Sequence, residues 1–463
     1  MTFIILAIMV MGYLLISTEK VTNINKSAVA IFIGTVGWVL YLCYGSDYVQ
    51  SQHLGEYASF LQGDASTGLA TKQFIAQNVF LKYVGKAAEI VLFLLATMSI
   101  VEILQNNGCF DFLLQLMRTR SSKRLLWMAA AITFLLSVNL DNLTTTVMML
   151  TLMHKVVEGR RNRMIYGSVI VVSANCGGAL TVIGDPTGLV LWNMGAVTAT
   201  NFSMALLIPC LIAWLMPVWW IGRALPERIE TQWVTLPYRG DDTNLKVWQR
   251  ALMLFVGIGG LWFIPTFHNI TRLSPFLGAF CVLAVLSIVN EVVNRKLLKS
   301  GDNTNRRIPR VLQYGVIQMM LYVMGVMLAM GVMTETGIVA WVAQFLQKEV
   351  HHVWLLGTMA GVMSLVIDEF MSAMSMISLF PVTETEAVVQ HWGADFAQNG
   401  IYWKIVAYAS AMGSNVLGIG SMCGLAYMKT ERVRVNWYFR NVGVKCAVGA
   451  LVGLAVMWFM NVL

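Results

Sequence analysis

Charged residues are scarce in this sequence: only 12% of its 463 residues are Asp, Glu, Lys or Arg, whereas 57% are hydrophobic. Long apolar runs, such as residues 3–16 and 446–460, recur from one end of the chain to the other. This composition excludes a soluble globular domain. The runs are also unlike the short alternating segments of a β-barrel, and they favour membrane-spanning helices, which need about 20 apolar residues each.

Motifs for ATP hydrolysis or redox chemistry are missing as well. The sequence has no Walker motif, haem signature or paired zinc-ligand spacing, so ATP-driven and redox-driven transport have no support. The seven cysteines are scattered without a CxxC pair, which argues against a disulfide framework or a metal site. The first apolar run has no basic residues before it and is interpreted as a retained helix, not a signal peptide. We expect a secondary transporter with no cofactor, no enzymatic activity and no nucleic-acid partner.

Basic residues are concentrated in a few segments between the apolar runs, and the positive-inside rule predicts that these segments are cytoplasmic. They lie at residues 20–26, 118–124, 155–163, 223–246, 295–310 and 429–440, with Lys26 at the end of the first. The loops at about 46–87, 266–272, 334–352 and 381–401 are poorer in basic residues for their length and are expected to face outward. We therefore predict a multi-pass protein of a bacterial inner membrane.

The topology contains an anomaly that predicts two re-entrant hairpins. The cytoplasmic segments at 118–124 and 155–163 flank one apolar stretch, and a single crossing cannot return to its own side. We predict a helical hairpin at about 125–153 with its turn near Asn139 to Asn142, and an inverted one at about 353–380 with its turn near Asp368. Irregular backbone at this depth is tolerated only where it lines an enclosed or watered cavity, which makes both turns candidate sites.

Sequence similarity relates the two halves. The first hairpin motif Ser137-Val-Asn-Leu-Asp141-Asn142 matches Ser364-Leu-Val-Ile-Asp368-Glu369 in the second. Each hairpin precedes a glycine-rich apolar segment, at about 164–199 and 402–428, in which Ile-Gly-Asp185 and Ile-Gly-Ser421 fall in register. Glycine at this density, with Pro186 in the first segment, predicts helices broken in mid-membrane. Free carbonyls and helix ends at such breaks coordinate ions in repeat-built transporters.

The predicted fold class is an all-α polytopic membrane protein with two inverted repeats, each holding a re-entrant hairpin and a broken transmembrane helix. Residues 1–84 would form N-terminal scaffold helices and an outer loop, and residues 85–222 the first repeat. Residues 223–248 would form a cytoplasmic linker, and residues 249–463 the second repeat.

Acidic and small polar residues gather at the predicted turns and breaks. Burying Asp141 costs at least about 2.5–3.5 kcal/mol, which favours a role in binding a cation or proton over a mere hairpin cap. Asp368 is the symmetric candidate, with Glu369 beside it. Asp185 either caps the second half-helix or faces the ion, and both interpretations stay open. Oxygen ligands for a hard cation are also offered at the breaks by Asn175, Thr181, Ser414, Asn415 and Ser421, although such residues also hold membrane helices together. Glu89 and Glu102, on one apolar helix, are candidates for a proton path.

The stretch from Glu89 to Glu102, the motif at 137–145 and the segment at 175–187 resemble the NhaD-type sodium/proton antiporters of the ArsB/NhaD-like ion transporter superfamily. That superfamily also holds arsenite and dicarboxylate carriers, and the resemblance covers about residues 85–440. It implies a homodimer in which a mobile transport domain moves against a scaffold as an elevator. It also implies an ion site at Asp141, Asn142, Thr144, Thr145, Asn175, Asp185, Thr187 and Asp368, with Na⁺ at Asp141, Asn142, Asn175 and Asp368.

The second half departs from the family pattern. It has Asp368-Glu369 where the superfamily often repeats Asp-Asn, and Gly413-Ser-Asn415 in place of a plain glycine run. This leaves the ion preference or the second site open.

These observations favour a secondary antiporter that exports sodium, with lithium left open, in exchange for protons. Asp141 and a second carboxylate, either Asp368 or Asp185, would bind sodium and protons in mutual exclusion. The alternative within transport is an anion or oxyanion carrier for dicarboxylate or arsenite, against which the acidic turns argue. An intramembrane aspartyl protease is a further alternative, but broken helices have no role in its chemistry.

Overall fold

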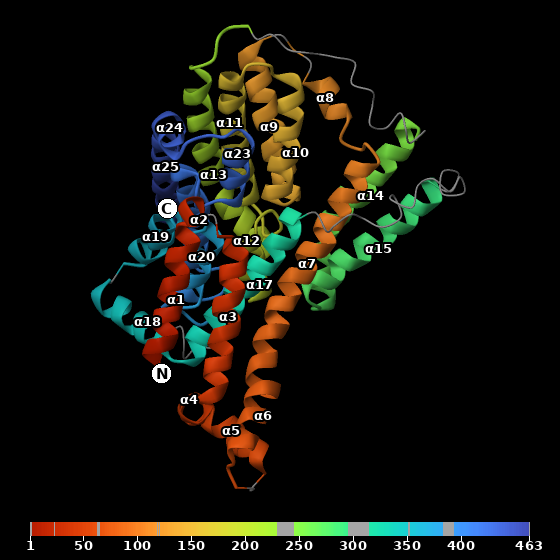
Figure 1. The fold of residues 1–463 in the computed structure, drawn as a ribbon. Helices are drawn as coiled ribbons and strands as arrows, with labels where there is room; N and C mark the ends of the chain where they lie inside the picture. Colours follow the sequence, from red (N-terminus) through yellow and green to blue (C-terminus); the bar gives the residue numbers. More distant parts are fainter. Residues whose placement is uncertain are drawn as a thin grey trace.

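A computed structural model gives the fold (Figure 1) and describes residues 2–22, 24–62, 65–117, 119, 121–228, 245–294, 314–350, 352–382 and 393–462. Most of the predicted linker at 223–248 and all of the basic segment at 295–310 lie outside these residues. The described part of the chain is almost entirely helical and holds no β-strand, which confirms the all-α prediction.

The N-terminal part contains three apolar helices, with a group of short helices before the third. Its elements are α1 (Thr2–Ser17), α2 (Glu19–Thr22), α3 (Lys26–Cys43), α4 (Gly45–Gln52), α5 (Leu54–Leu61), α6 (Gly68–Phe74), the π-helical η1 (Ile75–Phe80) and α7 (Leu81–Asn106). Because α6, η1 and α7 run on without a break, the helix predicted to open the first repeat begins well before residue 85. The short helices α4 to α6 protrude at one end of the molecule (Figure 1).

The middle of the chain contains the first helix pair and the first broken helix. It consists of α8 (Phe112–Leu116), α9 (Ser122–Asn139), α10 (Asn142–Val156), α11 (Arg160–Gly178), α12 (Pro186–Asn193), α13 (Ala199–Gly222), α14 (Val247–Thr271) and α15 (Pro275–Val293). Pro186 stands at the first position of α12, where its fixed φ and missing N–H suit a helix start.

The last part repeats this order of a helix pair followed by a broken helix. It consists of α17 (Tyr314–Glu335), α18 (Ile338–Glu349), α19 (Val353–Ser364), α20 (Glu369–Ile377), the 3₁₀ turn η4 (Ala394–Phe396), α22 (Ile401–Leu417), α23 (Met422–Thr430), α24 (Val435–Tyr438), the π-helical η5 (Phe439–Gly443) and α25 (Val444–Val462). Gly418 ends α22 with a φ of +68°, a left-handed conformation that glycine adopts without strain.

Eight helical segments of the described chain are long and apolar enough to cross a membrane. They are α3, the helix from Gly68 to Asn106, α13, α14, α15, α17, the segment spanning α22 and α23, and the segment from Val435 to Asn461. The paired helices α9, α10, α19 and α20 are not among them. That these helices are not candidate membrane spans agrees with the predicted hairpins, which remain a prediction.

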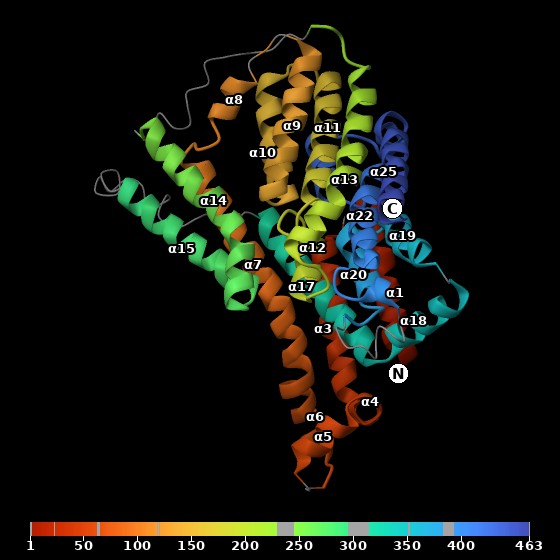
Figure 2. The same cartoon turned by 180° about the vertical axis from the view of Figure 1, so that it is seen from behind.

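The helices form two groups. In the first, α1, α3 and α17 pack together and α17 contacts α7, while α14 and α15 lie beside α7 (Figures 1 and 2). The approach of α3 to α17 requires glycine, because a Cβ on Gly325 would lie 2.4 Å from the backbone of Ala30. In the second group α9, α10, α11 and α13 pack with α22, α23 and α25 (Figure 2).

Two turns and two breaks in the chain coincide with the positions predicted for them. The turns fall between α9 and α10 at Leu140 and Asp141, and between α19 and α20 just before Glu369. The breaks fall between α11 and α12 and between α22 and α23. The division of the chain into inverted repeats at the predicted boundaries remains a prediction.

Candidate ion-binding site

Asp141 caps the N-terminus of α10 with one carboxylate oxygen and leaves the other unused. Its Oδ2 accepts hydrogen bonds from the backbone N of Thr144 at 2.9 Å and from the Thr144 hydroxyl at 3.1 Å. Its Oδ1 is buried and receives no hydrogen bond from the described residues, and the buried hydroxyl oxygen of Thr145 is in the same position. Buried polar atoms almost always have a partner, so this oxygen is suited to a proton or a cation.

Asp185 caps α12 and joins the first turn to the first break. Its Oδ2 accepts from the backbone N of Thr187 at 3.0 Å, and its Oδ1 accepts from Asn142 Nδ2 at 3.1 Å. The backbone N of Asn142 donates in turn to the carbonyl of Gly184 at 3.2 Å. Asp141 and Asp185 lie within electrostatic range of each other. Two buried carboxylates at adjacent helix N-termini form a site that favours positive charge.

Asp368 occupies the matching position in the second half, as the cap of α20. Its Oδ1 accepts from the backbone N of Phe370 at 3.1 Å, and its Oδ2 forms an ion pair with the ammonium of Lys26. The backbone N of Glu369 donates to the carbonyl of Gly420 at 2.7 Å. The second turn therefore meets the second break as the first turn meets the first.

The two broken helices are joined at their breaks by side-chain hydrogen bonds. Asn175 of α11 donates from Nδ2 to Asn415 Oδ1 of α22 and to the hydroxyl of Ser421, which caps α23, both at 2.9 Å. Ser414 Oγ donates to Glu369 Oε2 at 2.6 Å. These bonds place the N-termini of four half-length helices, α10, α12, α20 and α23, around one polar region.

Asp185 connects the acidic groups of the two halves. It lies within electrostatic range of Asp141 on one side and of Asp368 and Glu369 on the other. The acidic residues predicted at the two turns are thus both within electrostatic range of Asp185.

The two halves also match in their closest backbone approaches. A Cβ on Gly184 would lie 2.5 Å from the carbonyl oxygen of Ser137, and a Cβ on Gly420 would lie 1.9 Å from that of Ser364. Ser137 and Ser364 are the first residues of the two similar hairpin motifs. Glycine is therefore required at both breaks so that the hairpin turn can reach them.

Glu89 has its hydrogen-bond partners at the far end of α12 from Asp185. Glu89 accepts hydrogen bonds from Asn193 Nδ2 at 2.8 Å and from the Ser274 hydroxyl at 3.1 Å. Asn193 ends α12, about 12 Å along the helix from Asp185 at 1.5 Å per residue. Glu102 lies about 20 Å along α7 from Glu89 by the same measure.

Lys26 is a residue of the site that the sequence interpretation did not single out. The basic-segment argument assigned it to a cytoplasmic loop, but it begins α3 and is only 7% exposed. Its ammonium pairs with Asp368 and lies 4.8 Å from the centre of the Tyr322 ring. A lone lysine at the start of an apolar run has the same sequence signature in a loop and in a buried ion pair, so only the fold distinguishes them.

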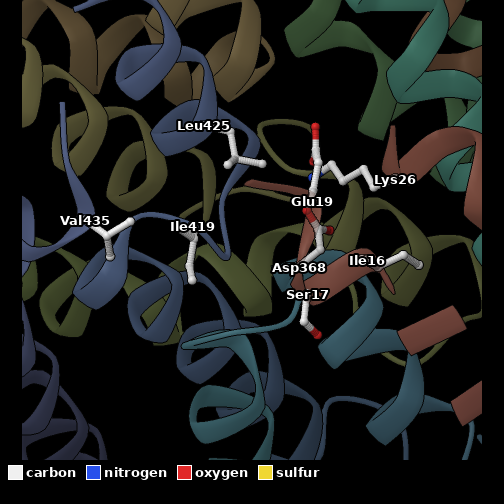
Figure 3. A pocket seen from close by; sticks show the side chains of 8 residues that line it. All are labelled: Ile16, Ser17, Glu19, Lys26, Asp368, Ile419, Leu425 and Val435. Carbon is white, nitrogen blue, oxygen red and sulfur yellow. Dashed lines mark hydrogen bonds and ion pairs between the residues drawn. The ribbon is translucent and has the colours of Figure 1, made fainter. Parts of the chain in front are cut away.

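A pocket of about 150 Å³ leads to this ion pair (Figure 3). Its lining consists of Ile16, Ser17, Glu19, Lys26, Asp368, Ile419, Leu425 and Val435. Lys26 and Asp368 reach it from different elements, α3 and the turn before α20. The described residues contain no group of three or more His, Cys, Asp or Glu side chains arranged for a metal ion.

Several relatives of this chain are named as sodium/proton antiporters. Sodium/proton antiporter 1 of Arabidopsis thaliana is 30% identical over 372 residues, which are 80% of this chain and 62% of that protein. Sodium/proton antiporter 2 of the same plant is 26% identical over 448 residues, 96% of each chain. The Na(+)/H(+) antiporter NhaD of Vibrio parahaemolyticus is 25% identical over 375 residues, 76% of this chain and 84% of that protein. The chain thus spans less than two thirds of the first relative and nearly all of the second.

The family comparison covers the two turns, the whole of the first broken helix and the part of α22 up to residue 413. A family model described as "Citrate transporter" (CitMHS) matches residues 13–413. Together with the apolar spans and the antiporter relatives, this match makes the protein a multi-pass membrane transporter and not an enzyme. The chain belongs to the CitMHS family of transporters.

Proposed function

We propose that the protein is a secondary active Na⁺/H⁺ antiporter that exports sodium in exchange for protons. The observation that carries the proposal is the buried carboxylate of Asp141, whose Oδ1 has no hydrogen-bond partner among the described residues and which lies in electrostatic range of Asp185. The printed activities of the relatives support the same exchange.

The second carboxylate of the site is Asp185 in this proposal. Sequence considerations left the choice between Asp185 and Asp368 open, and the geometry favours Asp185 because Asp368 already has a cationic partner in Lys26. Asn142 contacts Asp185 directly and stands next to Asp141 in the chain, so it ties the two carboxylates together. Thr144, Thr145 and Thr187 complete the proposed oxygen set at the ends of α10 and α12.

Exchange follows from competition for these oxygens. Two neighbouring carboxylates in a low-dielectric region cannot both stay charged and unpaired, so the pair holds either a proton or a cation. A sodium ion that binds displaces the proton, and a proton that binds displaces sodium. An inward proton gradient then drives sodium out of the cell.

Asn175, Ser414 and Asn415 have a different part in the proposal. Their side chains already bond across the breaks, so they fix the two broken helices against each other. Asn175 offers its Oδ1 to Ser421 at 3.2 Å. These residues keep the two broken helices in a fixed relative position. A sodium ion needs this because its oxygen ligands must converge on one point.

The remaining parts of the proposal follow the family resemblance. We infer a bacterial inner membrane as the location, a homodimer as the assembly and a transport domain that moves against the scaffold. Glu89 and Glu102 stay candidates for a proton path along α7, and lithium stays a candidate substrate.

The proposal is tested by replacing Asp141→Asn and following sodium-dependent proton movement in everted membrane vesicles with a pH-sensitive dye. Asn keeps the helix cap but cannot trade a proton for a cation, so the sodium response is expected to fall to the background of empty vesicles. Asp395→Asn is the matched control, because Asp395 is exposed in η4, and it should behave as wild type. A wild-type rate and sodium affinity in Asp141→Asn would refute the assignment.

A carrier of carboxylate anions is the second candidate, and the printed description of the family model favours it. The acidic caps at α10, α12 and α20 oppose it, because an anion would meet three carboxylates at the helix ends where it should bind. Uptake of radiolabelled citrate into proteoliposomes distinguishes the two candidates. Saturable citrate uptake without sodium-dependent proton movement would establish the anion carrier.

A further inference from the structure

The caps of α10 and α20 are equivalent in position but differ in what meets their second oxygen. Asp141 uses Oδ2 to cap α10 and leaves Oδ1 without a partner among the described residues. Asp368 uses Oδ1 to cap α20, and its Oδ2 pairs with the ammonium of Lys26. The place that is open at the first turn is therefore filled by a positive charge at the second.

The ammonium group that pairs with Asp368 belongs to a different part of the fold. Lys26 is the first residue of α3, which packs against α17 and belongs to neither helix pair. Asn25 caps α3 by accepting from the backbone N of Ser27 at 2.9 Å, so the start of the helix and its lysine are held in place. Both members of the ion pair are buried. A tethered ammonium has a high effective concentration at its partner, which a free cation must exceed in order to displace it.

We propose that Lys26 is a built-in counter-cation that keeps sodium out of the second turn, so that each chain binds a single sodium ion at Asp141 and Asp185. This inference rests on the proposed sodium site at the first turn. An ammonium and a sodium ion carry the same charge and compete for the same carboxylate oxygen. The lysine cannot be transported, so the second half contributes a fixed charge where the first half contributes an exchangeable one.

The surroundings of the pair can accept a sodium ion once the ammonium is removed. The adjoining pocket of about 150 Å³ has room for roughly five waters at about 30 Å³ each. Ser17 and Glu19 add polar oxygens to its lining, next to Asp368 (Figure 3). Ser414 and Glu369 hold the neighbouring break in shape whether or not the lysine is present.

The test counts sodium ions bound by the purified full-length protein, using equilibrium binding of ²²Na⁺ in detergent. Wild type is expected to bind one sodium per chain. Lys26→Gln removes the ammonium and is expected to bind two, whereas Lys26→Arg keeps the charge and should bind one. Lys348→Gln is the matched control, since Lys348 is exposed on α18 and does not line this pocket, and its count should stay at one.

Two further variants keep the test decisive if Lys26→Gln does not fold. Asp368→Asn removes the second carboxylate and should leave the count at one, with sodium affinity within about twofold of wild type. The double variant Lys26→Gln/Asp368→Asn buries no unpaired charge and should also bind one. A count of one in folded Lys26→Gln, or the loss of sodium binding in Asp368→Asn, would overturn the inference.

The same counts separate this inference from the antiport proposal. If wild type binds no sodium, the proposed antiport fails, yet a rise from none to one in Lys26→Gln would still establish Lys26 as the blocking charge. If wild type binds one sodium and Lys26→Gln does not gain another, antiport stands and the role of Lys26 fails.

Discussion

At the residue scale, the site depends on aspartates that each perform two tasks. Asp141, Asp185 and Asp368 all cap helices, and a cap alone contributes about 0.5–2 kcal/mol. A serine performs the same task at the fourth helix, as Ser421 does for α23. The three buried carboxylates therefore need a reason beyond capping, because neutral caps would avoid the cost of burying charge.

Asp185→Asn separates the two tasks of Asp185. Asparagine is as good a cap as aspartate, so α12 should stay intact while the charge beside Asp141 is lost. We expect apparent sodium affinity to fall at least about tenfold, since losing a charged interaction of about 1.5–3 kcal/mol exceeds the 1.4 kcal/mol of one decade. Sodium titration of dye-reported proton movement measures this, with Asp395→Asn as the control. Unchanged affinity would exclude Asp185 from the site.

Asn175→Ala tests the connection between the broken helices. Removing the side chain leaves the Asn415 amide oxygen and the Ser421 hydroxyl without their bonds from Nδ2. Leaving buried polar groups unpaired costs about 1–3 kcal/mol, so the detergent-solubilised protein should unfold at a lower temperature. Asn441→Ala, at an exposed position, should unfold as wild type does. A wild-type midpoint for Asn175→Ala would show that the bond is not needed for stability.

The sequence predicted the acidic groups of the site better than their pairing. Asp141 and Asp368 stand out because charge within an apolar run is costly, and this signal is local. The bond from Asn142 to Asp185 and the pairing of Lys26 with Asp368 join residues far apart in the chain. Such contacts leave no local signal. Lys26 was not singled out for a further reason: the positive-inside rule applies to every lysine at a helix end, whether it is solvated or buried.

At the element scale, each helix pair meets a broken helix through glycine. The turns reach the breaks because Gly184 and Gly420 have no side chain in the way. The same approach gives the backbone bonds from Asn142 to Gly184 and from Glu369 to Gly420, at 3.2 and 2.7 Å. A turn and a break are thus one unit, and this unit occurs once in each half.

Gly420→Ala should separate the second turn from the second break. The added Cβ would lie 1.9 Å from the carbonyl oxygen of Ser364, so the backbone must shift, and overpacking of this kind costs about 1–3 kcal/mol. We expect at least about a fivefold loss of sodium-dependent proton movement. Gly85→Ala is the matched control, because a Cβ there meets nothing within 4 Å. Equal activity of the two variants at equal expression would show that the close approach is not required.

Helix breaks could be predicted because their cause is local. Glycine and proline weaken a helix wherever they occur, and the parity of the basic segments predicts that 125–153 is not a simple crossing. Helix extents were less accessible, since η1 and α6 continue α7 back to Gly68, within the segment expected to be an outer loop at about 46–87. Lys72 and Lys82 lie within this continuous helix.

At the scale of the whole molecule, the two halves share a plan but differ in charge. The first turn has an open carboxylate oxygen at Asp141, and the second has the Lys26 pair at Asp368. If the halves are inverted repeats, one ancestral arrangement has become an exchange site in one half and a fixed ion pair in the other. Such asymmetry would let one chain move one cation per cycle while both halves keep the same helix framework.

The central claim is that sodium and protons compete for one buried carboxylate site, and the pH dependence of sodium affinity tests it most directly. Binding of ²²Na⁺ to the purified wild-type protein would be titrated at several pH values at constant ionic strength. Competition predicts that the apparent Kd rises by about tenfold for each unit of falling pH where the empty site is protonated, and that Asp141→Asn shows no such dependence. A wild-type sodium Kd that stays constant across the acidic and neutral range would contradict the account.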